Sequence, residues 1–331
     1  MTKEQINELL LKGQFGEYQG LPDMIETHIS WVFICDQFVY KIKKPIQYSF
    51  LDFSSLEKRK YFCHREIELN NRLTEGIYLD VQAVSTTAGR YFIGGKNGEV
   101  IDYAVRMKKM DSELQMDVLL LNNKVTRTDI QNLAERIAIF HKNTDIILQK
   151  DILDVQKKFD DLGEESDYLG EQLNANSKTI ISNAIITSYT FVQKNKALLN
   201  SRLKAGFFRD CHGDLHSRNI FLLPYPQPFD CIEFNDDFRQ IDVLNEIAFL
   251  CMDLDAFGRE DLSNLFFTSY NNLFSSIKTE DDRKLFVYYK SYRSNIRAKV
   301  NSLRARNTTD GAQKTAALKE ADKYLHLMDV I

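Results

Sequence analysis

The sequence predicts an α+β protein with two lobes, and three observations lead to this prediction. In the first third of the chain, short runs of β-branched and aromatic residues surround a single helical pattern. Apolar residues then recur at helical spacing, interrupted by one short hairpin pattern. The 331 residues suffice for two substantial cores. We therefore expect a small lobe over residues 1–109 and a helical lobe over residues 110–331.

Strand patterns define the small lobe. Residues 25–35 and 38–43 are rich in β-branched and aromatic side chains, and only residues 36–37 separate the two runs, which predicts a hairpin. A second group of strands is expected over about residues 81–110, broken by a glycine-rich turn at residues 94–98. Together with one helix, these strands make up the predicted small lobe.

That helix lies between the two strand groups. It is expected over about residues 54–73, where Ser54 and Glu57 form a candidate capping box. Spacings of four, three and four place four side chains on one face: Phe62, Glu66, Leu69 and Leu73. An acid on such an apolar face requires a buried cation or a place at the edge, so Glu66 is a candidate for an ion pair.

The helical lobe begins with a helix that Thr128 and Gln131 are expected to cap. Its predicted apolar face consists of Ile130, Leu133, Ile137 and Phe140. A further helix is predicted over residues 177–200. Residues 219–223 and 229–234 form the predicted hairpin, because three prolines occupy the turn between them. Helices are then expected to continue to the C-terminus.

Composition excludes several classes of protein. Apolar residues make up 44% and charged residues 27%, which is ordinary for a soluble globular protein. The net charge of −4 predicts no nucleic-acid or membrane partner. No apolar run reaches the roughly 20 residues that span a bilayer, and the first residues do not form a signal peptide. The five cysteines are odd in number and scattered, which predicts reduced thiols in a cytoplasmic protein.

The strongest chemical signal is the segment His-Gly-Asp-Leu-His-Ser-Arg-Asn at residues 212–219, which leads into an apolar strand. Phosphoryl transfer requires a carboxylate that orients the acceptor hydroxyl and accepts its proton, and oxygen ligands for Mg²⁺ on the phosphates. Asp214 suits the first role as the catalytic residue. The amide oxygen of Asn219 suits the second as a metal ligand. The segment therefore predicts a Mg²⁺- and ATP-dependent phosphotransferase.

This segment resembles the catalytic loop of the aminoglycoside-phosphotransferase-like branch of the protein-kinase superfamily, which includes antibiotic, choline and other small-molecule kinases. Residues 137–141 (IAIFH) and 241–248 (IDVLNEIA) resemble two further segments of the family. The resemblance implies a bilobal protein-kinase-like fold, with ATP and Mg²⁺ in the cleft between the lobes and a small molecule as the acceptor. Asp242 and Glu246 would brace the catalytic loop.

A bacterial subgroup of the family resembles the chain more closely, in VYKIKKP, FLDFSSLEKR and EFNDDFRQIDVLNEIAFLCMDLD. Some members of this subgroup are fused to a P-loop ATPase domain, and its substrate is not settled. The resemblance therefore implies a P-loop ATPase as a partner, and it leaves the acceptor open.

The second metal position departs from the family pattern. Family members present Ile-Asp-Phe or Ile-Asp-Trp after the catalytic loop, whereas this chain has Ile-Glu-Phe at residues 232–234. We expect Glu233 to be the second metal ligand, since a longer carboxylate still binds Mg²⁺. Asp230 and Asp236 are close enough in sequence to remain alternatives.

Two lysines compete for the role that holds the nucleotide phosphates. Lys41 and Lys43 lie on the same predicted strand, and a period of two points both to one face. In kinases such a lysine pairs with a glutamate on the following helix, which here is Glu66. We favour Lys41, and Lys43 remains open.

No G-x-G-x-x-G loop exists in the sequence. The turn at residues 27–30 is expected to take its place, with backbone N–H groups and Ser30 near the phosphates. Residues 106–110 (RMKKM) fall where the hinge that binds adenine is expected, so the backbone at Lys108 and Met110 would contact the base.

Several polar residues have structural interpretations. His141 is expected to pack at a helix end, and His212 to hold the catalytic loop by hydrogen bonds rather than to act as a base. Asp253 and Asp255 are acids that could meet the substrate, and an exposed surface is an equal expectation for them.

A basic stripe raises the question of the acceptor. No acid occurs between Asp282 and Asp310, and one helical stripe in this interval carries Lys290, Arg293, Arg297 and Arg304. In the family the C-terminal helices wall the acceptor pocket, so the stripe suggests an acceptor with phosphate or carboxylate, held by Arg293 and Arg297. A solvated helix face or a docking surface for an acidic partner is the competing interpretation.

The sequence therefore predicts a kinase of small molecules. A protein kinase that modifies Ser or Thr is disfavoured, because the chain lacks an evident D-F-G to A-P-E segment. The third hypothesis is a catalytically weak nucleotide-binding module that regulates an ATPase partner, and Glu233 is the residue that motivates it.

Overall fold

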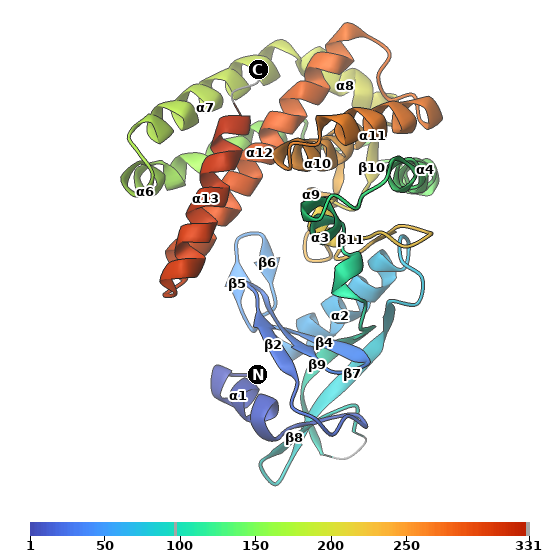
Figure 1. Ribbon diagram of the computed structural model, residues 1–331, viewed down its shortest axis with the longest axis vertical. Helices are drawn as coiled ribbons and strands as arrows, with labels where there is room; N and C mark the ends of the chain where they lie inside the picture. Colours follow the sequence, from blue (N-terminus) through green and yellow to red (C-terminus); the bar gives the residue numbers. More distant parts are fainter. Residues whose placement is uncertain (96–97, 329–331) are drawn as a thin grey trace. The chain divides into compact units, whose positions relative to one another are not determined.

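Two compact units make up the protein. The structure is a computed structural model, and it describes residues 1–95 and 98–328. Contacts between Cα atoms place Met1–Leu119 and Asn219–Phe238 in the first unit, and Leu120–Arg218 and Arg239–Ile331 in the second (Figure 1). The α+β class is confirmed. The boundary expected after residue 109 stays a prediction.

The first unit is built on a seven-stranded sheet of order β1-β8-β7-β9-β4-β3-β2. Its strands pair antiparallel, except that β1 pairs parallel with β8. The strands are β1 Gln14–Phe15, β2 Asp23–Glu26, β3 Ser30–Ile34, β4 Phe38–Lys43, β7 Tyr78–Thr87, β8 Arg90–Ile93 and β9 Glu99–Lys108.

Smaller elements complete the first unit. Two short pairs are β5 Gln47–Tyr48 with β6 Leu51–Asp52, and β11 Ile220–Phe221 with β12 Gln227–Pro228. The helical segments are α1 Lys3–Lys12, α2 Leu56–Asn70 and η1 Ser112–Leu114. Helix α3 (Met116–Leu121) and helix α9 (Asp236–Arg239) lie where the chain passes between the units.

The predicted hairpin is present as β3 and β4, closed by a hydrogen bond from Cys35 N to Phe38 O of 2.9 Å. The single strand expected over residues 25–35 is wrong, because the chain turns between β2 and β3. The predicted turn at residues 27–30 is confirmed, since Thr27 Oγ1 accepts a hydrogen bond from Ser30 N at 2.9 Å. In the other expected turn, Lys96 and Asn97 lie outside the described residues.

Helix α2 begins later than expected. Ser55, not Ser54, is its N-cap, and the Ser55 hydroxyl accepts a hydrogen bond from Lys58 N at 3.2 Å. The Ser54 hydroxyl donates instead to Asp52 Oδ1 at 2.6 Å. The predicted face is buried at Glu66 and Leu69, whereas Leu73 lies beyond the end of the helix.

The second unit is mainly helical. Its helical segments are α4 Arg127–Asn143, α5 Asp154–Asp160, η2 Asp161–Glu165, α6 Ser166–Gln172, α7 Asn176–Lys194, α8 Lys196–Lys204, α10 Val243–Ala256, α11 Glu260–Leu273, α12 Glu280–Asn307 and α13 Gly311–Leu327. A two-stranded sheet, not expected from the sequence, joins β10 Phe208–Asp210 to β13 Gln240–Asp242. The 3₁₀ turn η3 spans Ser217–Asn219.

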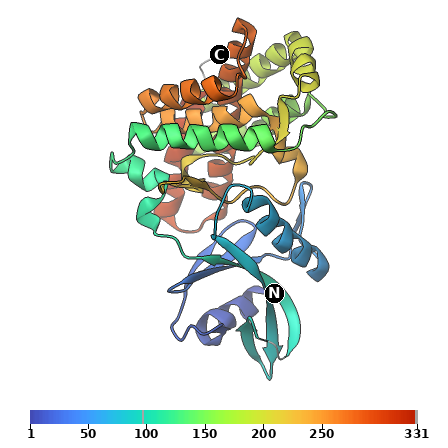
Figure 2. The same cartoon turned by 90° about the vertical axis from the view of Figure 1, so that its right-hand side faces the viewer.

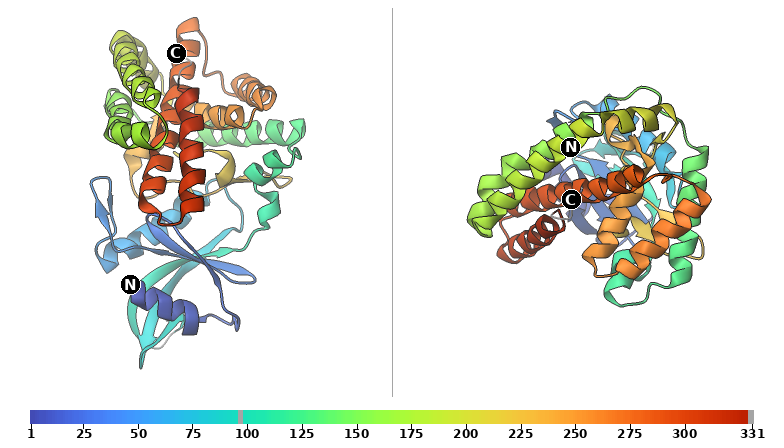
Figure 3. Two further views of the ribbon diagram at one scale, coloured as in Figure 1. Left: turned by 60° about the vertical axis from the view of Figure 1, so that its left-hand side comes forward. Right: turned by 90° about the horizontal axis from the view of Figure 1, so that it is seen from above.

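Helix α10 is the centre of this unit. Every residue from Val243 to Leu254 is buried, so α10 is covered on all sides. It packs against α11, α12 and α13. Figure 2 shows α4 alongside α11, and both views of Figure 3 show α12 and α13 side by side.

Two helix predictions need correction. Helix α4 is capped by Thr126 with Asp129, not by Thr128 with Gln131, although the predicted apolar face is buried as expected. The helix expected over residues 177–200 ends at Lys194, and α8 starts anew. At the break, the Asn195 side chain donates to Phe191 O at 2.8 Å, a local bond that competes with continued helix.

The predicted hairpin around the prolines is shorter than expected. Ile220 pairs with Pro228, so the second strand is β12 and not residues 229–234. Asp230 adopts φ +62, a left-handed backbone conformation that a strand cannot contain. Glu233 therefore lies in an irregular segment rather than on a strand.

Two global expectations can be compared with the structure. All five cysteines are buried, and none of them forms a disulfide within the described residues. Among the helices of residues 1–95 and 98–328, none combines the length and the apolarity needed to cross a lipid bilayer.

Candidate functional site

One buried glutamate joins two lysines in the first unit. Lys41 and Lys43 point to the same face of β4, where Glu66 of α2 meets them both. Glu66 Oε1 lies 2.8 Å from Lys41 Nζ, and Glu66 Oε2 lies 2.6 Å from Lys43 Nζ. The contact between Lys41 and Glu66 that the sequence predicts is therefore present, and Lys43 shares the same carboxylate.

The two lysines differ in their second partner and in their exposure. The Lys43 side chain is 0% exposed and forms its second ion pair with Glu233, which is also buried. The Lys41 side chain is 11% exposed, and its second partner is Asp230 Oδ1 at 2.6 Å, on a side chain that is 44% exposed. Of the two side chains, that of Lys41 is the more exposed, and its second partner is also partly exposed.

Electrostatics keep this cluster charged. Burial alone would lower the pKa of Lys41, but Asp230 and Glu66 raise it well above its usual value. For Lys43, Glu233 and Glu66 likewise outweigh burial and raise the pKa. Burial would raise the pKa of Glu66, but the two lysines lower it to about 2. Lys41, Lys43 and Glu66 are thus held in their charged forms, whereas burial raises the pKa of the Glu233 carboxyl in spite of the nearby Lys43.

The backbone fixes Asp230 and Glu233. Asp230 N donates to the Tyr78 hydroxyl at 3.1 Å, and Cys231 N donates to Asn70 Oδ1 at 2.9 Å. Asp230 holds its carboxylate toward Lys41 from a left-handed backbone, a conformation that Asp tolerates better than most residues. Asp236, the other alternative metal ligand, lies on α9 with an exposed side chain 3.9 Å from Arg65 Nη2.

Other predicted nucleotide residues occupy defined positions in the first unit. Ser30 is buried in β3, and its Oγ has no hydrogen-bond partner among the described residues. Lys108 is the last residue of β9. Met110 follows it and is partly buried against a hydrophobic core of the first unit. Asn219 immediately precedes β11, and its carbonyl accepts a hydrogen bond from Phe229 N at 2.8 Å.

In the second unit, two buried side chains hold the backbone of residues 212–218, the predicted catalytic loop. Glu246 Oε1 accepts a hydrogen bond from His212 N at 2.6 Å, and Oε2 accepts one from Gly213 N at 3.0 Å. His212 Nδ1 accepts a hydrogen bond from Asp214 N at 3.2 Å. The structural roles predicted for Glu246 and His212 are confirmed. Asp242 instead caps α10 and pairs with Arg202 at 2.6 Å.

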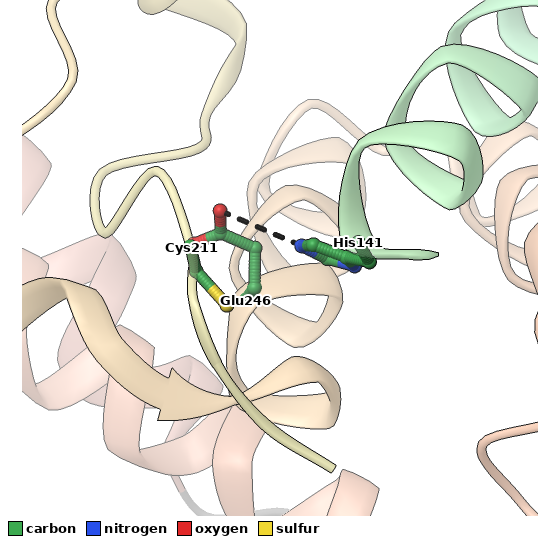
Figure 4. A group of neighbouring side chains, drawn as sticks. All are labelled: His141, Cys211 and Glu246. Atoms are coloured by element: carbon green, nitrogen blue, oxygen red, sulfur yellow. Dashed lines mark ion pairs between the residues drawn. The ribbon is translucent and has the colours of Figure 1, made fainter. Parts of the chain in front are cut away.

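His141 and Cys211 lie beside Glu246 (Figure 4). Ligand-type atoms of the three residues fall within 4.8 Å of one another, and all three residues are buried. His141 Nε2 is 3.9 Å from Glu246 Oε1, and His141 Nδ1 is 2.7 Å from the Tyr270 hydroxyl. Because backbone donors already occupy both oxygens of Glu246, this group is best described as packing behind the catalytic loop.

Asp214 lies among basic side chains. His216 Nε2 is 3.5 Å from Asp214 Oδ2, and Arg297 Nη1 is 3.5 Å from the same histidine nitrogen. Burial would raise the pKa of the Asp214 carboxyl, but His216 and Arg297 lower it well below its usual value. Asp214 is therefore ionised at neutral pH and able to accept a proton or a hydrogen bond.

The predicted basic stripe does not form one exposed face. Arg293 is buried and donates to Asn245 Oδ1 at 2.6 Å and to Gly213 O at 3.0 Å. Arg297 is also buried, and its Nε has no hydrogen-bond partner among the described residues. Lys290 pairs with Asp255, and Arg304 is exposed. A solvated face is thus wrong for Arg293 and Arg297, and their contact with an acceptor stays a prediction.

Asp253 faces the catalytic loop and not the solvent. Its Oδ2 accepts hydrogen bonds from Ser217 N at 2.8 Å and from Ser217 Oγ at 2.5 Å. The Tyr324 hydroxyl donates to its Oδ1 at 3.1 Å. Sequence reasoning missed this role, and it missed Asp230 as the partner of Lys41. The helical spacing of Glu246 and Asp253, seven residues apart, is the signal that both face one side of α10.

No protein-family model matches the chain. Among curated proteins, "Uncharacterized protein Rv2004c" of Mycobacterium tuberculosis and "Uncharacterized protein Mb2027c" of Mycobacterium bovis are each 28% identical over 290 residues. The aligned region covers 85% of this chain and 55% of each relative. The chain thus spans about half the length of the curated relatives it matches.

Solved structures resemble this one over nearly the whole chain. A choline kinase from Cryptosporidium parvum Iowa II has a TM-score of 0.55 and 12% identity, covering 92% of this chain and 88% of its own. The GDP and kanamycin complex of APH(2")-IIia has a TM-score of 0.52 and 10% identity, covering 98% of both chains. At such identities the likeness concerns the fold. The bilobal, kinase-like α+β fold predicted from the sequence is confirmed, and the chain has the fold of the choline kinases and aminoglycoside phosphotransferases.

Proposed function

We propose that the protein is a Mg²⁺- and ATP-dependent phosphotransferase that moves the γ-phosphoryl group to a hydroxyl of a small molecule. The observation that carries the proposal is the pairing of Lys41 with Glu66 in a chain that also holds Asp214 on a loop braced by Glu246. Similar folds in choline kinase and in aminoglycoside phosphotransferase structures support it. Because one of these structures is a complex with GDP, GTP belongs beside ATP in any test.

In this proposal Lys41 contacts the nucleotide phosphates. Its side chain is the more exposed of the two lysines, whereas the Lys43 side chain is enclosed between Glu66 and Glu233. Lys43 would keep Glu66 and Glu233 in place. The turn containing Ser30 and the backbone of Lys108 and Met110 are the remaining proposed contacts with the nucleotide.

Asn219 and Glu233 would hold the metal. Their amide and carboxylate oxygens are the ligand types that Mg²⁺ prefers, so the residues present fit this ion. Bound Mg²⁺ would neutralise phosphate charge. The Lys43 contact occupies Oε1 of Glu233, so its other oxygen is the one suited to a metal.

Asp214 would orient the acceptor hydroxyl and take its proton while the phosphoryl group moves to the acceptor oxygen and ADP leaves. Asp214 is ionised at neutral pH, as this role requires. Four residues of the chain separate it from Asn219, so the catalytic carboxylate and the metal ligand belong to one continuous segment. Most of the rate would come from positioning and charge neutralisation.

A second candidate is a nucleotide-binding module that regulates an ATPase partner. The observation that favours it is the ion pair between Glu233 and Lys43, which competes with metal binding. The half of each curated relative that this chain does not span leaves room for such a P-loop ATPase partner. Tight nucleotide binding without turnover would distinguish this candidate from a kinase.

Other parts of the proposal concern location and partners. The odd number and scattered positions of the five cysteines support a cytoplasmic protein. The net charge of −4 supports the absence of a nucleic-acid or membrane partner. Fractionation of cells that produce the protein tests the first of these expectations directly.

Asp214→Asn should lower turnover by about 10²-fold or more while nucleotide affinity changes by at most a few-fold, because the carboxylate acts on the acceptor. The measurement is a metabolite screen for Mg²⁺-dependent phosphorylation with ATP and GTP, followed by titration calorimetry. Asp261→Asn, which alters an exposed acid of the same unit, is the matched control. Wild-type turnover in the Asp214→Asn enzyme would remove Asp214 from the catalytic role.

Asn219→Ala and Glu233→Ala should each weaken nucleotide binding in Mg²⁺ and leave binding in EDTA nearly unchanged, because each change removes one oxygen ligand. Affinities measured at several Mg²⁺ concentrations give the comparison. If Glu233→Ala keeps the normal Mg²⁺ dependence while Asp230→Ala or Asp236→Ala abolishes it, the ligand assignment is wrong.

Lys41→Met should weaken ATP binding by about tenfold or more and should destabilise the fold less than Lys43→Met does, because the side chains of Lys41 and of its partner Asp230 are partly exposed. Lys43→Met should instead destabilise the fold by about 3–5 kcal/mol, because it leaves two buried carboxylates with less positive charge. Nucleotide titration and urea unfolding of both variants separate the two roles. The reverse pattern would assign the phosphates to Lys43.

The acceptor is proposed to carry phosphate or carboxylate, because Arg297 offers a buried cation beside Asp214 whose Nε makes no hydrogen bond to the described residues. Arg297→Ala should raise the KM of an anionic acceptor by about tenfold or more. Arg293→Ala should lower kcat for every acceptor, because Arg293 holds Gly213 O.

A panel of anionic and cationic hydroxyl compounds provides the measurement, and Arg304→Ala on the exposed end of α12 is the control. Efficient phosphorylation of kanamycin-like polycations would contradict the anionic acceptor. So would an anionic substrate whose KM is the same for the wild type and for Arg297→Ala.

A further inference from the structure

We propose that His216 is a positioning residue, which holds Asp214 Oδ2 through its Nε2–H and leaves the other carboxylate oxygen for the acceptor hydroxyl. The inference rests on the proposed function, in which Asp214 receives the acceptor's proton. His216 would thus take part in the site as well as Asp214. The contacts at its two ring nitrogens define which nitrogen carries the proton.

The contact at Nδ1 determines where the proton of the ring lies. Arg218 N donates a hydrogen bond to His216 Nδ1 at 3.3 Å. A ring nitrogen that accepts such a bond carries no proton, so the neutral imidazole has its proton on Nε2. In an imidazolium, Nδ1 would also carry a proton, and its N–H would point at the backbone N–H of Arg218.

Two groups then compete for Nε2. Arg297 Nη1 and Asp214 Oδ2 each lie 3.5 Å from this nitrogen. The guanidinium can only donate, so it cannot bond to a nitrogen that already carries a proton, whereas the carboxylate can accept. The Nε2–H is therefore directed at Asp214.

Packing holds the ring in this orientation. The His216 side chain is only 6% exposed, and its ring centroid lies 5.2 Å from that of Phe249 on α10. The Asp214 side chain is 37% exposed, so part of its carboxylate remains accessible. In the reaction the Nε2 proton stays on His216, and Asp214 takes the acceptor proton on its other oxygen. His216 thus limits the rotation of Asp214 without joining the proton transfer.

Two conservative replacements of His216 test the roles of its two ring nitrogens separately. The amide of His216→Asn reaches the place of Nδ1, where it can accept from Arg218 N, but it lacks the donor toward Asp214. The amide of His216→Gln reaches the place of Nε2 and keeps that donor. We expect kcat within about threefold of the wild type for His216→Gln, and a fall of about tenfold or more for His216→Asn. The KM for ATP should change by less than about threefold in both.

A direct readout of the ring accompanies the kinetics. In protein labelled with ¹⁵N-histidine, the His216 signals, identified by their loss in His216→Asn, should show a protonated Nε2 and a bare Nδ1 at neutral pH. Asp214→Asn should shift the Nε2–H signal, because the carboxylate that accepts this bond becomes an amide. Urea unfolding of each variant verifies that it is folded.

Two results would contradict the proposed role of His216. An active His216→Asn with an inactive, folded His216→Gln would mean that the ring serves only the backbone of the loop. A proton on Nδ1 would exclude the proposed contact. If the wild type phosphorylates no acceptor, the proposed function fails instead, and the histidine signals still decide whether His216 contacts Asp214.

Discussion

A single carboxylate, that of Glu66, holds together the charged centre of the first unit. Its two oxygens bind two different lysines on one strand, and each lysine then reaches a separate acid in the segment that follows the short hairpin. Burying charges is unfavourable unless every one is matched, and removing one partner leaves the others uncompensated. The same ion pairs consequently constrain helix α2, strand β4 and residues 230–233. Movement of any one of these elements would leave a buried charge without its partner.

In the second unit, side chains from neighbouring helices fix the backbone conformation of the proposed catalytic loop. Its backbone groups bond to charged side chains from two helices: Glu246 and Asp253 of α10, and Arg293 of α12. Hydrogen bonds to charged groups are about twice as strong as neutral ones, so the loop conformation follows from helix packing more than from its own sequence. Side chains of the loop add to this framework, since His212 Nδ1 accepts a hydrogen bond from Asp214 N and the Ser217 hydroxyl donates one to Asp253.

The sequence predicted what local patterns encode. The loop that contains Asp214, the pairing of Lys41 with Glu66 and the buried face of α4 all follow from residue type and spacing. The predictions were wrong where two adjacent residues are equally suited to one position, as Ser54 and Ser55 are to the N-cap of α2. The left-handed backbone at Asp230 and the burial of Arg293 leave no local signal, because distant elements impose them through Tyr78 and Gly213 respectively.

Asp230 has a consequence for how the protein selects among ligands. Its carboxylate already pairs with Lys41, so a phosphate that bound there, as we propose, would compete with an internal anion for this lysine. Affinity at this lysine would then be a difference between two ion pairs, and changes to the backbone around Asp230 would alter it without changing any group that touches the ligand.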